Sequence, residues 1–100
     1  MPVEVSFDEQ KNEVTVVVTG RFDFTCHNDF RRAFALGFAG AKYRVDLGQA
    51  SYMDSAALGM LLLLRDKAEG DPARVEVANS RGQPRDVLQI ANFGQLLRLT

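Results

Sequence analysis

The hydrophobic period of this chain alternates between the two-residue spacing of a strand and the four-residue spacing of a helix. Val3, Val5 and Phe7 recur at every second residue, and the wholly polar stretch 8–13 separates them from a β-branched run at 14–19 that ends at Gly20. Two strands joined by so short a turn predict an antiparallel hairpin.

Three helix–strand units are predicted after this hairpin. Cys26, Phe30, Phe34 and Phe38 share one face of a first helix, with Thr25 as its N-cap and Gly40 as its stop. The remaining pattern predicts strands at 43–47, 74–78 and 96–99, a helix from Ser55 to Glu69 closed by Gly70 and Pro72, and a helix over about 84–92.

The predicted order is therefore β-β-α-β-α-β-α-β, in one domain that spans residues 1–100. Helices placed between strands imply parallel pairing with right-handed crossovers. We expect an α/β fold: a mostly parallel five-stranded sheet with an antiparallel edge strand and about three helices packed on it.

Composition narrows the possible partners and the compartment. A net charge of −1 gives no basic surface for nucleic acid. The single cysteine, Cys26, cannot form an internal disulfide, which fits a reducing compartment. We see no secretory leader at the first residues, and the longest apolar run, 56–64, is too short to span a bilayer. We expect a cytoplasmic protein with no membrane partner.

Catalytic, metal and cofactor sites are not expected. The sequence has no Gly-rich phosphate loop, no paired catalytic carboxylates and no nucleophile elbow. His27 is the only histidine and has no second ligand at metal-binding spacing. Cys26 lies on the phenylalanine stripe and is interpreted as a small core residue rather than a reactive thiol. The chain is therefore not expected to be an enzyme.

The segment 45–59 carries the most functional information. A strand ends, a polar turn follows, and Asp54-Ser55 opens a helix, with Ser55 as N-cap or first helical residue. A phosphate on Ser55 would meet unpaired backbone N–H groups and the positive end of the helix dipole, next to acidic Asp54. Asp-Ser pairs also cap helices without being modified, and local chemistry alone leaves both uses open.

A family resemblance adds to this picture. The run Tyr52-Met53-Asp54-Ser55-Ala56-Ala57-Leu58-Gly59 resembles the signature of STAS domains of the anti-sigma factor antagonist type, which usually reads Asp-Ser-Ser-Gly-Leu-Gly. The earlier run Gly20-Arg21-Phe22-Asp23 resembles the Gly-Glu-Leu-Asp that ends the second strand of that family. Ala56 and Ala57 depart from the signature, where the family has its second serine and first glycine.

The resemblance implies partner switching. The unphosphorylated antagonist would bind an anti-sigma factor that is also a serine kinase, the kinase would phosphorylate the motif serine and dissociate, and a serine phosphatase would restore the antagonist. Ser55 matches the phosphoacceptor, Asp54 the motif acid and Asp23 the loop acid near that site. A constitutive STAS subunit of a transporter or stress-sensing complex is the alternative implied by other members.

A helical wheel of residues 55–69 separates two faces. Ala57, Leu61, Leu64 and Ala68 form the expected core side. The apolar residues Met60, Leu62 and Leu63 form either an exposed strip for a partner or the margin of a wide buried face. The predicted partner surface comprises Asp23, Asp54, Ser55, Ala56, Gly59, Met60, Leu62 and Leu63.

Overall fold

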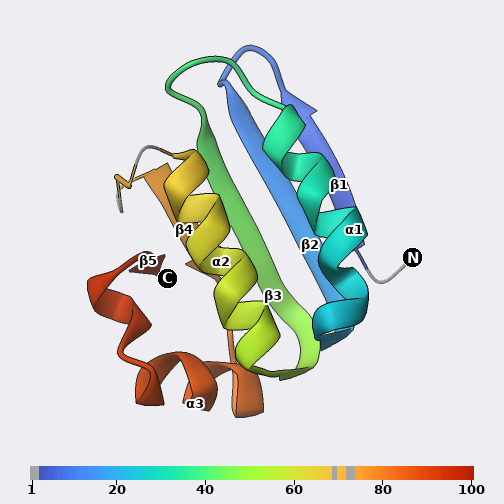
Figure 1. Ribbon diagram of the computed structural model, residues 1–100, viewed down its shortest axis with the longest axis vertical. Helices are drawn as coiled ribbons and strands as arrows, with labels where there is room; N and C mark the ends of the chain where they lie inside the picture. Colours follow the sequence, from blue (N-terminus) through green and yellow to red (C-terminus); the bar gives the residue numbers. More distant parts are fainter. Residues whose placement is uncertain (1–2, 69, 72–73) are drawn as a thin grey trace.

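The computed structural model describes residues 3–68, 70–71 and 74–100. The fold is built on a five-stranded sheet in the order β1-β2-β3-β4-β5, and three α-helices connect or follow the strands (Figure 1). The strands are β1 (Val3–Asp8), β2 (Glu13–Phe22), β3 (Lys42–Met53), β4 (Val75–Ala78) and β5 (Arg98–Leu99). The helices are α1 (His27–Arg31), α2 (Ser55–Lys67) and α3 (Gly82–Ile90), with 3₁₀ turns η1 (Phe24–Cys26), η2 (Arg32–Ala35) and η4 (Phe93–Gln95).

The predicted topology is confirmed. β1 pairs with β2 antiparallel, and every later pairing is parallel. Helices α1 and α2 cover one face of the sheet (Figure 1). Most side chains that point to the opposite face are polar and exposed or half-buried, such as Glu4, Thr15 and Arg44, although half-buried Val17 and buried Ala78 also lie there. The domain is thus two layers thick, and its shortest dimension is 19 Å.

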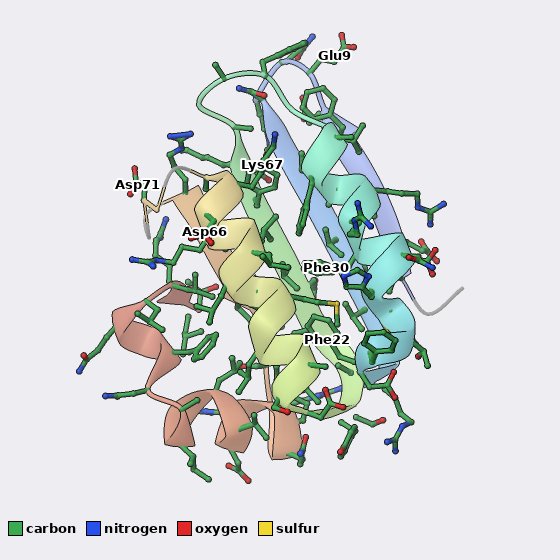
Figure 2. The ribbon with its side chains drawn as sticks, viewed as in Figure 1. Glu9, Phe22, Phe30, Asp66, Lys67 and Asp71 are labelled. Atoms are coloured by element: carbon green, nitrogen blue, oxygen red, sulfur yellow. The ribbon has the colours of Figure 1, made fainter. Side chains whose placement is uncertain are left out.

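The core fills the space between the sheet and α1 and α2. Phe22 from β2 and Phe30 from α1 are fully buried with ring centroids 5.5 Å apart (Figure 2). The predicted core face of α2 is confirmed, because Ala57, Leu61 and Leu64 are fully buried. Cys26 is buried as a core residue, as expected.

Two strands are longer than the sequence pattern predicts. β2 does not end at Gly20 but continues to Phe22, since Gly20 adopts a φ of +79° and the pairing register shifts beside it. β3 does not end at Leu47 but continues to Met53, because the extension of β2 supplies it with a hydrogen-bonding partner. The stretch interpreted as a polar turn is therefore the second half of β3.

The first helix differs most from its prediction. Thr25 does not cap it: Asp23 caps the η1 turn that leads into α1, and α1 itself has no side-chain cap. The helical stretch ends with η2 at Ala35, well before Gly40, since Leu36 has an extended backbone (φ −94°, ψ 157°). Phe38 is consequently not on the core stripe: it is 62% exposed and packs edge-on against Phe7. The Asn12 side chain holds this segment, because its Oδ1 accepts from Phe38 N at 2.7 Å.

The remaining boundaries shift by a few residues. Helix α2 begins at Ser55 as predicted and ends at Lys67, whereas Glu69 and Pro72 lie outside the described residues. Helix α3 covers Gly82–Ile90 rather than about 84–92, and only Arg98–Leu99 of the predicted last strand pairs with β4. No helix in the described part of the chain is long and apolar enough to cross a membrane.

Candidate functional site

The N-terminus of α2 forms the centre of the candidate site. Asp54 has an extended backbone (φ −126°, ψ −172°), and its Oδ1 accepts a hydrogen bond from Ala57 N at 3.1 Å. The Asp54 carbonyl oxygen accepts from Leu58 N at 3.2 Å. Asp54 is therefore the N-cap, and Ser55 is the first helical residue. The exposed Ser55 hydroxyl is not committed to capping its own helix.

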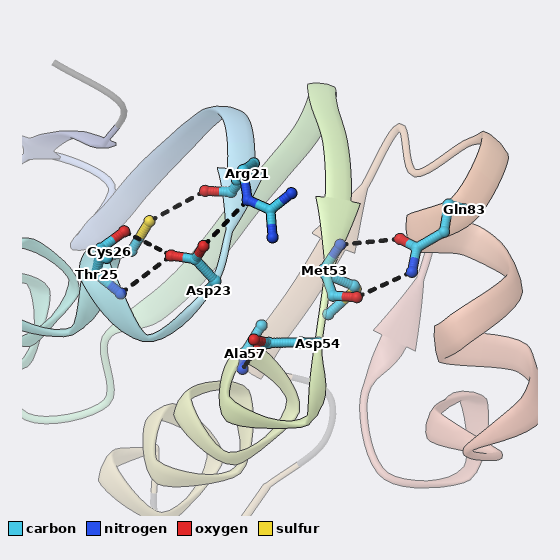
Figure 3. A network of polar contacts seen from close by, with 8 residues as sticks. All are labelled: Arg21, Asp23, Thr25, Cys26, Met53, Asp54, Ala57 and Gln83. Carbon is cyan, nitrogen blue, oxygen red and sulfur yellow. Dashed lines mark hydrogen bonds and ion pairs between the residues drawn. The ribbon is translucent and has the colours of Figure 1, made fainter.

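A second acidic cap lies at the end of the neighbouring strand. The Asp23 Oδ1 accepts hydrogen bonds from the backbone N–H and the hydroxyl of Thr25, and its Oδ2 lies 3.3 Å from Arg21 Nε (Figure 3). The hydrogen bonds from Thr25, supported by the Arg21 charge, lower the pKa of Asp23 below its usual value. Asp23 is therefore a fixed negative charge.

The sheet register brings these two caps to the same edge. β2 and β3 are parallel neighbours in which Phe22 is paired with Met53, so the next residue of each strand, Asp23 and Asp54, leaves the sheet side by side (Figure 3). Arg21, paired with Tyr52, stacks its guanidinium 4.1 Å from the centre of the Tyr52 ring. The site thus combines two carboxylates, one arginine and an exposed hydroxyl.

The other predicted partner-surface residues lie along α2 in two different environments. Gly59 is exposed, Ala56 is half-buried, and Leu62 and Leu63 are 37% and 48% exposed. Leu63 lies about 12 Å along the helix from Ser55, given a rise of 1.5 Å per residue. Of the two alternatives that the wheel left open, the buried margin holds for Met60, which is 3% exposed, and the exposed strip holds for Leu62 and Leu63. The assignment of Met60 to the partner surface is therefore wrong.

Sequence reasoning missed Phe24, the residue directly after Asp23. Its side chain is 72% exposed and stacks on the His27 ring at a centroid distance of 5.8 Å. The sequence does contain a signal for this role, because Phe24 is an aromatic residue that directly follows the loop acid Asp23 and precedes the buried stripe that begins at Cys26. Phe24 adds a large apolar side chain to the edge that holds Asp23 and Asp54.

His27 contributes a ring contact rather than a ligand set. In the described ranges, no group of three or more histidine, cysteine, aspartate or glutamate side chains could hold a metal ion. The described side chains at the site supply charge, hydrogen-bonding groups and the exposed Ser55 hydroxyl.

Comparison with known proteins identifies the family. A family model described as "Mlab, STAS domain" matches residues 5–98. The chain is a STAS domain. A STAS-domain containing protein of Pseudomonas aeruginosa (strain UCBPP-PA14) is 47% identical over 89 residues, which cover 88% of either chain. The resemblance seen in the sequence is thus confirmed for the STAS domain.

Solved structures share the fold. The anti-sigma factor antagonist SpoIIAA in its unphosphorylated form superposes with a TM-score of 0.71 at 18% identity, over 98% of this chain and 86% of that one. The phosphorylated form of SpoIIAA, described as a Bacillus cell fate determinant, gives 0.66 at 19% identity, over 98% and 90%. At these identities the likeness shows the STAS fold, with its mixed five-stranded sheet and three helices.

Proposed function

We propose that this STAS domain is an anti-sigma factor antagonist that acts by partner switching at Ser55. Unphosphorylated, it binds an anti-sigma factor that is a serine kinase, and phosphorylation of Ser55 releases that partner until a serine phosphatase removes the phosphate. The observation that carries the proposal is that Asp54 caps α2, so the exposed Ser55 hydroxyl is not needed to cap the helix.

Phosphorylation at this position changes charge without breaking the fold. The phosphate would lie at the positive end of α2, where helix N–H groups favour an anion. It would add close to two negative charges next to Asp54, at the edge that already holds Asp23. Covering that charge with a partner that does not neutralise it costs several kcal/mol, which converts a tight complex into a weak one.

The surface around Ser55 also supplies apolar area for docking. Phe24 lies on the Asp23 side of the edge, and Leu62 and Leu63 lie along α2, all three being exposed. Exposed apolar side chains that gather on one surface mark protein–protein interaction sites, and polar groups commonly form the rim of such an interface. The partner is therefore expected to cover the start of α2 and the η1 turn together.

A phosphate-mapping experiment tests the proposal. The chain is incubated with ATP and an extract of the cells that produce it, and the modified residue is located by mass spectrometry. We expect phosphate on Ser55, since Ala56 removes the second hydroxyl of the family signature. Phosphate on exposed Ser51 with none on Ser55 would contradict the switch.

The family model favours a second candidate function, because its description names Mlab and not an anti-sigma factor antagonist. A constitutive STAS subunit of a transporter or stress-sensing complex would use the same surface without a switch. Capture from the same extract separates the two functions. A switch requires that Ser55→Ala retains its partner and Ser55→Asp loses it, whereas a constitutive subunit retains the same partner with both variants.

A further inference from the structure

The end of β3 is held by a side chain from a distant helix. Met53 N donates to Gln83 Oε1 at 2.8 Å, and Gln83 Nε2 donates to Met53 O at 3.0 Å (Figure 3). Gln83 is the second residue of α3, thirty residues further along the chain. One amide side chain thus brackets both main-chain groups of the residue that precedes Asp54.

The topology explains why such a bracket is needed. β4 is four residues long and pairs only with Tyr43–Asp46 of β3, so the second half of β3 extends past it. Within the described residues, no strand pairs with Met53 on that side. The Gln83 amide makes the two reciprocal hydrogen bonds that a residue on an antiparallel neighbour would make. It acts as a one-residue substitute for the missing strand.

Helix α3 begins in a way that directs Gln83 toward β3. Gly82 has a φ of +61°, a left-handed conformation that favours glycine, and the first turn of α3 has no side-chain cap. The Gln83 side chain forms its hydrogen bonds with β3 instead of capping its own helix. Pro84 next to it is buried, which anchors the turn.

We propose that Gln83 is a positioning residue for Ser55. Only Asp54 separates the bracketed Met53 from Ser55, so the two hydrogen bonds fix the direction in which the chain enters α2. The bracket presents the Ser55 hydroxyl in one geometry to the enzyme that phosphorylates it. This inference rests on the proposed role of Ser55 as phosphoacceptor.

The test compares Gln83→Met with Gln89→Met. Methionine has a similar length but cannot form either bond. Gln89 is an exposed residue of the same helix, whereas the two hydrogen bonds to Met53 both come from Gln83. Initial rates of Ser55 phosphorylation are measured against chain concentration, with ATP and an extract of the producing cells as the kinase source.

We expect Gln83→Met to lower the apparent kcat about tenfold or more, since small misplacements of a reacting group are costly, and to leave KM within about twofold. KM should hold because the docking residues on α2 are unchanged. Gln89→Met should match the parent. The amide of Met53 should exchange with solvent faster in Gln83→Met only, as measured by NMR.

The other possible results contradict either this inference alone or the proposed function as well. A Gln83→Met chain that melts earlier but is phosphorylated with the parent's kcat and KM shows a purely structural role and overturns the inference alone. If Gln83→Met does not fold, Gln83→Asn, which keeps the amide but is one methylene too short to bracket Met53, must show the same fall in kcat. If the parent itself receives no phosphate on Ser55, both the proposed function and this inference fall.

Discussion

At the scale of single residues, the structure separates two roles that the Asp54-Ser55 pair could share. Either residue type caps helices well, and the sequence allowed Ser55 to be the cap. The hydrogen bond from Ala57 N to the Asp54 carboxylate gives the structural role to Asp54. Ser55 is left with an exposed side chain, as a modifiable hydroxyl requires.

This division predicts unequal costs of substitution. Asp54→Ala should lower the free energy of unfolding by about 0.5–2 kcal/mol, the usual cost of losing a side-chain cap. Ser55→Ala should change it by no more than about 0.5 kcal/mol, as at other exposed positions. Urea unfolding of both variants measures the difference. Equal losses would show that Ser55 shares the capping role.

At the scale of elements, α2 serves the core and the proposed interface with different faces. The core face holds Ala57, Met60, Leu61 and Leu64, whereas Gly59 and Leu63 point to solvent. This separation allows stability and binding to be changed independently.

Gly59→Ala should raise stability and weaken binding. A Cβ built on Gly59 meets no atom within 4 Å, so the methyl group fits the free chain. Replacing glycine by alanine in a helix interior should stabilise the fold by about 0.5–1 kcal/mol. If the partner approaches the helix closely here, the same methyl lowers affinity. Urea unfolding and titration of the captured partner measure the two effects, and unchanged affinity would place the partner away from Gly59.

Leu63→Arg should impair partner binding, whereas Met60→Ala should impair stability. Leu63→Arg should keep the melting temperature and weaken the partner complex about tenfold or more, because Leu63 is exposed and forms part of the proposed interface. Met60→Ala should lower the free energy of unfolding by about 2–5 kcal/mol, because Met60 is buried.

The control for this comparison is Glu9→Lys. Glu9 is exposed in the β1–β2 turn, at the end of the molecule opposite to the start of α2 (Figure 2). It should match the parent in melting temperature and in affinity. Weaker binding by Glu9→Lys with unaltered binding by Leu63→Arg would move the interface to the hairpin end.

At the scale of the whole molecule, an ion pair joins the later strands on the face of the sheet away from α1 and α2. Arg44 Nη1 on β3 lies 2.8 Å from Glu76 Oε1 on β4, and the Thr100 hydroxyl donates to Glu76 Oε2 at 2.7 Å. The Thr100 hydrogen bond, followed by the contacts with Arg44, lowers the pKa of Glu76 below its ordinary value of 4.5.

This depressed pKa predicts a pH dependence with a definite sign. A carboxyl group whose folded pKa lies below the unfolded one stabilises the fold above the unfolded pKa, and the contribution disappears as the pH falls through the folded pKa. The parent should therefore lose its stability advantage over Glu76→Gln as the pH falls from neutral to below about 4.5. Urea unfolding at several pH values measures the difference, and a constant difference would contradict the assignment.

The sequence by itself determined the topology, the core face of α2 and the position of Ser55 at a helix start. These features follow from hydrophobic period and capping chemistry, which act between residues close in the chain. The departures from the family signature, Ala56 and Ala57, could also be identified from sequence alone.

Only the tertiary structure decided the length of β2 and β3, the Asp23 cap of the η1 turn, the burial of Met60, and the Gln83 bracket on Met53. Phe22 and Met53 are thirty-one residues apart, and their pairing brings Asp23 beside Asp54. Such contacts depend on strand register and on which groups lack a partner after the sheet has formed. Local periodicity carries no information about either, so the site's geometry is a property of the assembled sheet.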